Sequence, residues 1–175
     1  MRFAPTSLPG VHIIEPSPHV DRRGFFARLY EARAFADAGI DFTPADVNLS
    51  RNPTAGTLRG LHFQDPPFAE AKIVRVTRGR VFDVIVDLRP GPTLGRWTAV
   101  ELDAGLANAV FIPEGCAHGF LTLEPDTDVL YHMGRPYQPG QSRGFRYDDP
   151  AFAIDWPTAP TLIGDADLAW PAFVG

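Results

Sequence analysis

Short apolar segments interrupted by proline and glycine are the feature that most limits the folds open to this chain. It contains 18 prolines and 16 glycines among 175 residues, and they fall between these segments. Long helices do not extend across such breaks, whereas strands joined by turns do. The strand-like segments recur about every ten residues, a spacing typical of β-sandwiches and jelly rolls. The sequence therefore predicts an all-β fold.

Two pairs of apolar segments are expected to form neighbouring strands. Residues 72–77 and 80–88 are separated only by Arg78-Gly79, which predicts a hairpin. Residues 120–123 and 128–132 are predicted to pair in the same way around a short turn that contains proline.

The remaining segments predict isolated strands and little helix. Strands are expected at 96–102 and at 109–112, where alternation or an apolar run is bounded by turn residues. One helical segment, Tyr30–Ala38, ends at Gly39, a usual C-terminal stop. The proline- and tryptophan-rich tail from Asp148 is expected to cover the strands as irregular structure with a helical turn or two.

Composition excludes several classes of function. The formal net charge is −5, which argues against a broad nucleic-acid surface but allows an anionic small ligand. No apolar run approaches membrane-spanning length, and residues 1–14 lack the features of a signal peptide. Cys116 is the only cysteine, which suits a reducing compartment. We therefore expect one cytoplasmic domain covering residues 1–175, with neither nucleic acid nor membrane as a partner.

The segment Thr57–Gln64 holds the first candidate catalytic residues. Arg59 and His62 lie three positions apart, so a regular strand would place them on opposite faces. A bend at Gly60 would allow both to face one cavity. Without that bend, the same pattern describes a surface arginine and a histidine satisfied in the core.

Three further polar residues fall on or next to predicted strands. Lys72 shares a strand face with apolar residues, where it needs a partner such as an anionic ligand unless it reaches solvent at the strand end. His118 follows a tight turn, and Tyr131 lies on the next strand, where ordinary packing would also explain it. Each residue alone is a weak indication of a site, whereas their order along the chain is specific.

That order resembles the dTDP-4-dehydrorhamnose 3,5-epimerase family of the cupin superfamily. The similar segments extend over almost the whole chain, and their number makes the resemblance specific to the family more than to one substrate. They are Asp21–Phe26, Asn48–Ser50, Leu58–Gln64, Lys72–Val74, Gly79–Arg89, Leu94–Trp97, Ile112–Phe120, Asp148–Pro150 and Ile154–Pro157.

The resemblance implies a cupin-type double-stranded β-helix, or jelly roll, with one or two short helices. It implies epimerisation at C3 and C5 of a nucleoside-diphosphate 4-keto-6-deoxyhexose of the dTDP-4-dehydro-6-deoxyglucose type, with no cofactor. It also implies a homodimer with exchanged N-terminal strands, and the strand-like segment Val11–Ile14 could cover a sheet edge. The alternatives are a C3-only epimerase, an epimerase for a CDP-, GDP- or heptose-linked sugar, and a nonenzymatic sugar-nucleotide-binding cupin.

The resemblance also implies a role for each matched polar residue. His62 matches the general base, Tyr131 the general acid and Lys72 the cation beside the substrate ketone. Asp167 matches the carboxylate that pairs with His62, and Asp165 is its competitor. Contacts to the nucleotide, diphosphate or sugar are implied for Arg23, Asn48, Arg59, Lys72, His118 and Tyr137. They are also expected for Arg28 and Asp46, which stand at binding positions but differ from the family's residues there.

The reaction explains why such residues are needed. A C–H bond beside a ketone is a weak acid, and the charge that develops on the ketone oxygen needs a cation. A histidine, with a reference pKa of about 6.5, suits proton removal near neutral pH, and a carboxylate can fix its tautomer. A tyrosine, with a reference pKa of about 10, stays protonated and can return a proton to the opposite face.

The sequence also departs from related patterns. Many cupins bind metal through His-x-His, but here the motif is His62-Phe-Gln64 and no obvious carboxylate completes a site, so no metal is expected. Five positions differ from the epimerase family in ways that bear on nucleotide binding more than on proton transfer. They are Arg28 for Glu, Asp46 for Gln, Glu70 for Gln, Ser142 for Glu and Ala166 for a basic residue.

Overall fold

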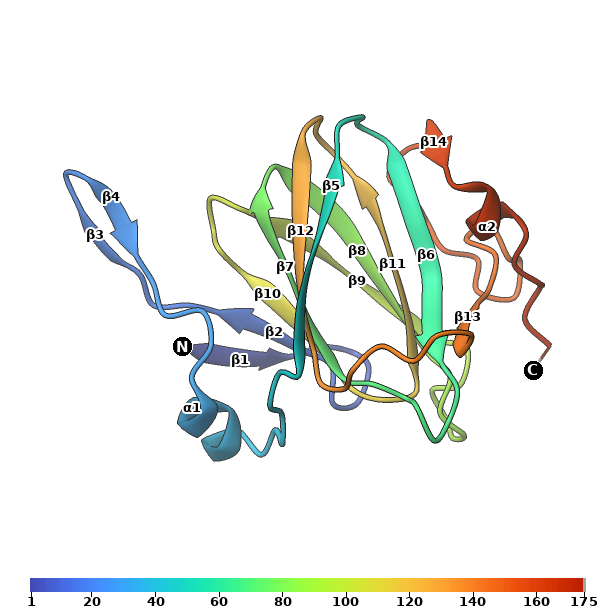
Figure 1. The fold of residues 1–175 in the computed structure, drawn as a ribbon, viewed down its shortest axis with the longest axis horizontal. Helices are drawn as coiled ribbons and strands as arrows, with labels where there is room; N and C mark the ends of the chain where they lie inside the picture. Colours follow the sequence, from blue (N-terminus) through green and yellow to red (C-terminus); the bar gives the residue numbers. More distant parts are fainter. Residues whose placement is uncertain (175) are drawn as a thin grey trace.

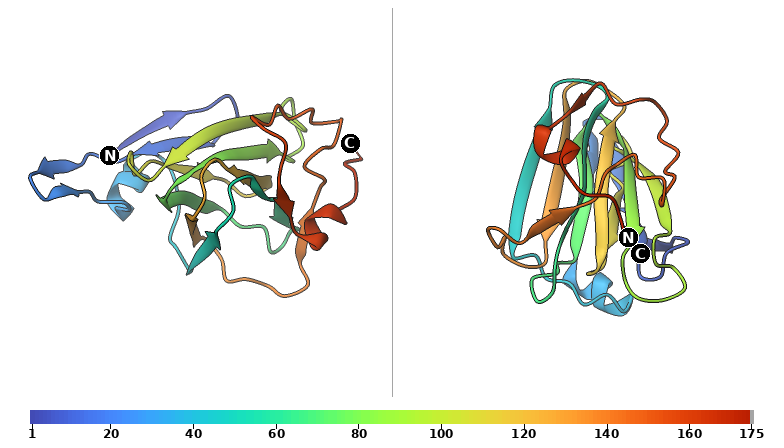
Figure 2. Two further views of the ribbon diagram at one scale, coloured as in Figure 1. Left: turned by 90° about the horizontal axis from the view of Figure 1, so that it is seen from above. Right: turned by 90° about the vertical axis from the view of Figure 1, so that its right-hand side faces the viewer.

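Two β-sheets face each other in the computed structural model, which describes residues 1–174 (Figure 1). Sheet I has the strand order β1-β2-β10-β7-β12-β5, and sheet II the order β13-β6-β11-β8-β9, with β14 pairing in parallel with β6. Figure 2 shows the two layers from above and from one side. The prediction of an all-β, jelly-roll type of fold with one or two short helices is confirmed, and the described residues contain two.

The strands of sheet I are β1 Arg2–Pro5, β2 His12–Glu15, β5 Asp46–Asn52, β7 Lys72–Arg78, β10 Ala109–Ile112 and β12 Thr127–Met133. Those of sheet II are β6 Thr57–Gln64, β8 Arg80–Asp87, β9 Trp97–Asp103, β11 Cys116–Thr122, β13 Ser142–Gly144 and β14 Leu162–Ile163. The remaining elements are the β3 His19–Asp21 and β4 Gly24–Phe26 hairpin, α1 Ala32–Asp37 and α2 Asp165–Leu168.

The two predicted strand pairings are wrong, because successive strands cross from one sheet to the other. Strand β7 lies in sheet I between β10 and β12, whereas β8 lies in sheet II between β11 and β9. In the same way β11 belongs to sheet II and β12 to sheet I. A sheet-to-sheet corner and a hairpin both consist of two apolar runs around a short turn, so the local sequence is the same for each. Strands that follow each other in sequence do pair at β1 and β2, at β3 and β4, and at β8 and β9.

Gly79 forms the corner between β7 and β8 in a single residue. Its φ is +77°, and a Cβ there would lie 2.3 Å from Oγ1 and 3.2 Å from Cα of Thr127. Thr127 is fully buried at the start of β12, and its hydroxyl donates to the Glu124 carbonyl at 2.8 Å, so it has little room to move. Two corners of the fold therefore touch, and only glycine fits the contact.

Crossing strands also bury both faces of the central strands. One apolar cluster fills the space between the sheets, a second lies under α1 outside sheet I, and a third lies under the C-terminal segment outside sheet II. This explains why 80–88 is a nearly continuous apolar run with little alternation. Within residues 1–174, no helix is both long and apolar enough to cross a membrane.

The helix prediction is confirmed in place but not in length. Helix α1 begins two residues later than expected, at Ala32, and Gly39 follows it with a φ of +75°. Tyr30 instead packs its ring against Phe35 and donates its hydroxyl to the Phe42 carbonyl at 2.8 Å. The irregular tail with one short helix, α2, is also as predicted.

We expect Gly79→Ala to lower the free energy of unfolding by about 2–5 kcal/mol, since a positive φ costs about 1–2 kcal/mol and overpacking adds about 1–3 kcal/mol. Gly140→Ala is the matched control, because Gly140 has a φ of +78° with no atom within 4 Å of an added Cβ. In this control the free energy of unfolding should fall only by the cost of the positive φ, about 1–2 kcal/mol. Urea unfolding followed by circular dichroism measures both, and equal losses would refute a steric role for the corner.

Candidate active site

The polar residues singled out by the sequence gather in a cavity of about 300 Å³ between the two sheets. This is at the small end of the range for small-molecule sites in proteins. Sheet I, sheet II and the loop after β12 all contribute to it. Seven predicted residues line the cavity, namely Asn48, Lys72 and Tyr131 from sheet I, Arg59, His62 and His118 from sheet II, and Tyr137 from the loop.

A bulge in β6 brings Arg59 and His62 into the same cavity. His62 pairs with His118 of β11, but Arg59 pairs with Phe120, so three steps along β6 match two along β11. Because of the extra residue, the side chains of Arg59 and His62 fall on the same face of β6 instead of opposite faces. Gly60 sits at this point with a φ of +132°, and a Cβ on it would lie 2.5 Å from the Cα of Gly119. The predicted bend is confirmed, and it requires glycine.

His62 is hydrogen-bonded to a buried carboxylate. Its Nε2 lies 2.6 Å from Oδ1 of Asp167, whereas Asp165 is exposed. Because a carboxylate only accepts, Nε2 carries the proton and Nδ1 is the basic nitrogen. Burial tends to raise the pKa of Asp167, but hydrogen bonds from His62, from the Gly60 amide at 3.2 Å and from Trp170 at 3.2 Å hold that pKa below its usual range.

A second histidine–aspartate pair lies on the neighbouring strands. Nε2 of His118 is 2.8 Å from Oδ2 of Asp83, and both side chains are buried. Complete burial raises the pKa of Asp83, while His118 and Lys72 favour its charged form. Sequence reasoning did not identify Asp83. The available signal was a carboxylate inside an apolar strand, which requires a partner.

Tyr131 lies on sheet I, across the cavity from the β6 strand of sheet II that carries His62. Its ring makes an edge contact with His118 at a centroid distance of 6.1 Å. Burial and the charge of Asp83 raise the pKa of Tyr131 far above its ordinary value, so the hydroxyl keeps its proton at neutral pH. It is therefore available as a proton donor.

Lys72 is buried, and its partner is a residue of this chain. Its Nζ lies 3.2 Å from Oε1 of Glu70, and both side chains are less than one-tenth exposed, at 7% and 8%. The expectation that a lysine facing the core needs a partner is correct. The ammonium uses one of its three donors on Glu70, which leaves two that can face a ligand.

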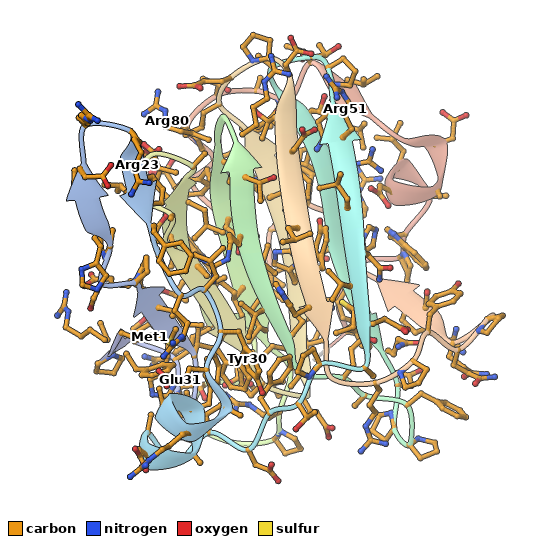
Figure 3. All side chains as sticks on the ribbon, turned by 60° about the vertical axis from the view of Figure 1, so that its left-hand side comes forward. Met1, Arg23, Tyr30, Glu31, Arg51 and Arg80 are labelled. Carbon is orange, nitrogen blue, oxygen red and sulfur yellow. The ribbon has the colours of Figure 1, made fainter. Side chains whose placement is uncertain are left out.

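Three of the predicted binding residues are not part of the cavity in a single chain. Arg23 lies on the β3–β4 hairpin and is bound to Asp21, and Figure 3 shows it to one side of the sheets. Arg28 is bound to Glu31 at 2.9 Å. Asp46 lies closer to the cavity, since its carboxylate accepts a hydrogen bond from the backbone amide of Tyr137, a cavity residue, at 3.3 Å. Among residues 1–174 no three His, Cys, Asp or Glu side chains are arranged to hold a metal ion.

Comparison with known proteins identifies the family to which these residues belong. The model of the dTDP-4-dehydrorhamnose 3,5-epimerase family matches residues 5–174. The chain belongs to the dTDP-4-dehydrorhamnose 3,5-epimerase family. Its resemblance to that family, inferred from sequence motifs, is therefore confirmed.

Individual members of the epimerase family match over nearly the full chain. A dTDP-4-dehydrorhamnose 3,5-epimerase of Sinorhizobium fredii is 40% identical over 174 residues, or 98% of this chain and 89% of the relative. A Streptomyces niveus protein named dTDP-4-dehydrorhamnose 3-epimerase is 40% identical over 95% of this chain and 81% of its own length. The crystal structure of the Bacillus anthracis 3,5-epimerase with TDP and PPi bound superposes with a TM-score of 0.95 at 36% identity, covering 98% of this chain and 99% of that one.

The depressed pKa of Asp167 predicts a pH-dependent contribution to stability. The contribution is complete above the unfolded-state pKa of about 3.9 and is lost as the pH falls through the lower folded-state value. We expect Asp167→Asn to lower the free energy of unfolding at pH 7 by about 1–3 kcal/mol, and the difference from the parent to shrink below about pH 4.

Asp165→Asn is the control, since it removes the same charge from the exposed face of the same helix. Chemical unfolding at a series of pH values measures both variants. If the two showed the same pH profile, the hydrogen bonds to Asp167 would not be the source of the effect.

Proposed function

We propose that the protein is an isomerase that inverts C3 and C5 of dTDP-4-dehydro-6-deoxyglucose by removing and returning protons beside its ketone. The observation that carries this proposal is the placement of a histidine–aspartate base on sheet II and a protonated tyrosine on sheet I, around one cavity. The names of the relatives support this class of substrate, since they are dTDP-4-dehydrorhamnose 3,5-epimerases.

The first step uses the base and the cation. Nδ1 of His62 takes the proton from C3, and the C–H electron pair moves toward the ketone oxygen at C4 to give an enolate. Asp167 stabilises the imidazolium that forms, as its short contact to Nε2 allows. The two free donors of the Lys72 ammonium stabilise the enolate oxygen.

The second step inverts the carbon. The Tyr131 hydroxyl donates its proton to C3 from the opposite side, the enolate electron pair forms the new C–H bond, and the ketone returns. Solvent then restores the proton of Tyr131 and removes the one held by His62. The same two steps at C5 complete the double inversion.

A C3-only epimerase is the second candidate. The observation that favours it is the Streptomyces niveus relative, which is named a 3-epimerase and is as similar in sequence as the double epimerases. Both activities need the same base, acid and cation. They differ only in how many carbons of the substrate reach them.

A homodimer with exchanged N-terminal strands is part of the proposal. The β3–β4 hairpin projects from the sheets (Figure 1) and exposes Val20, Phe25 and Phe26, while β5, the edge strand of sheet I, exposes Val47 and Leu49. Apolar surfaces of this kind usually lie in an interface. Such a dimer would carry the arginines near the hairpin, at positions 23 and 28, to the cavity of the partner. We place this single-domain protein in the cytoplasm, as its one buried cysteine suits.

Solvent deuterium tests the proposed reaction. In deuterium oxide, the protein and dTDP-4-dehydro-6-deoxyglucose should give product deuterated at both C3 and C5, observed by NMR. His62→Ala should lose about 10²–10⁴-fold in the exchange rate. His12→Ala is the control, because His12 lies on β2 and its ring bonds to the Gly10 carbonyl.

Each outcome of this experiment is decisive. Deuterium at C3 alone would establish the second candidate instead of the first. No exchange with this nucleotide, together with exchange in the CDP-, GDP- or UDP-linked sugar, would overturn the choice of dTDP. No exchange with any of the four would overturn the proposed isomerase.

A further inference from the structure

Three polar side chains of the cavity form a continuous hydrogen-bonded row. Nζ of Lys72 donates to Oε1 of Glu70 at 3.2 Å, and Nε2 of Gln64 donates to Oε2 of the same carboxylate at 2.6 Å. All three residues line the cavity between the sheets. Glu70 therefore binds the cation of the proposed mechanism with one oxygen and a neighbouring amide with the other.

The carboxylate determines which way the Gln64 amide points. A carboxylate has no proton to donate at neutral pH, so only the amide nitrogen of Gln64 can face it. The amide oxygen must then point away. A neutral amide at position 70 could bond to either end of Gln64 and would impose no such direction.

The Gln64 amide oxygen, which points away from Glu70, has no partner in the described part of the chain. Gln64 is 6% exposed, and its Oε1 is buried without a hydrogen bond. An unpaired acceptor in a low-dielectric site is unfavourable, which makes a donor from a bound molecule strongly preferred over an apolar group. Glu70 has no proton to donate, and Lys72 makes its hydrogen bond to Glu70 and none to this oxygen.

We propose that Gln64 is a specificity-determining residue whose Oε1 accepts a hydrogen bond from the C3 hydroxyl of the sugar, with Glu70 as the residue that positions it. This rests on the proposed function, in which Lys72 contacts the C4 ketone oxygen. Of the two carbons beside that ketone, C5 carries the ring oxygen and a methyl group, neither of which is a donor. C3 carries a hydroxyl, which is the only donor adjacent to the group that Lys72 holds.

A double-mutant type of cycle tests the proposal: it compares binding with and without the Gln64 amide, and with and without the C3 hydroxyl of the sugar. The probes are dTDP-6-deoxyglucose, which has no ketone and cannot react, and its 3-deoxy and 2-deoxy counterparts, measured by titration calorimetry. The parent should bind the full sugar about 10-fold more tightly than the 3-deoxy form, as expected when a buried acceptor loses its donor. Gln64→Leu should reduce this preference to about 2-fold or less, while leaving the preference over the 2-deoxy form unchanged.

Glu70→Gln provides a second, milder variant if Gln64→Leu does not fold. It keeps the size of the side chain and a bond to Lys72 but releases the Gln64 amide, so the 3-hydroxyl preference should fall at least about 3-fold. The proposal would be overturned if either folded variant kept the full preference for the sugar over its 3-deoxy form. It would also be overturned if the variants lost the preference over the 2-deoxy form and kept the other.

The same experiment separates this proposal from the proposed function. If the parent protein exchanges substrate protons but Gln64→Leu keeps the full preference for the 3-hydroxyl, the proposed function stands and only the role assigned to Gln64 is wrong. A parent that neither binds dTDP-6-deoxyglucose nor exchanges protons in the keto sugar contradicts both.

Discussion

Burying a charge between two β-sheets is unfavourable unless a partner of opposite charge or a set of hydrogen bonds accompanies it. The cavity of this protein meets that requirement three times, with His62 on Asp167, His118 on Asp83 and Lys72 on Glu70. Asp167 and Asp83 are not part of the cavity lining, whereas Glu70 lines the cavity beside Lys72. The pairs therefore fix the orientation of the three cations or histidines that face the cavity.

The jelly-roll topology allows these pairs to meet. Because the chain crosses between the sheets at most corners from β5 to β13, successive strands usually lie in opposite sheets, and strands far apart in sequence lie side by side. His62 and His118 pair directly across β6 and β11, while Tyr131 approaches from the other sheet. A base and an acid on opposite walls are what an inversion requires, since removal and return of the proton take place on opposite faces of the sugar.

The sequence predicted the fold class but not the strand pairing. Proline, glycine and short apolar runs indicate many strands, whereas nothing local distinguishes the corner at Gly79 from a hairpin turn. The difference lies in contacts such as that between Gly79 and Thr127, which join segments nearly fifty positions apart.

For the site, the sequence order of His62, Lys72, His118 and Tyr131 predicted the residues that the fold brings together. It did not predict Asp83 or the link from Gln64 through Glu70 to Lys72, because both depend on side-chain directions inside the folded cavity. Arg23 matches the family pattern and Arg28 departs from it, and both lie outside the cavity of a single chain, so their binding role stays a prediction.

The central claim is that two different groups handle the proton on the two faces of the sugar, and Tyr131→Phe tests it most directly. His62 alone can remove a proton and return deuterium to the same face, which leaves the configuration unchanged. We therefore expect the Tyr131→Phe protein to incorporate deuterium at C3 but to form little inverted product, both measured by NMR in one sample. Tyr137→Phe is the matched control, since Tyr137 also lines the cavity but is largely exposed, at 60%. Normal inversion by Tyr131→Phe would contradict the account, and a loss confined to Tyr137→Phe would assign the acid to the other tyrosine.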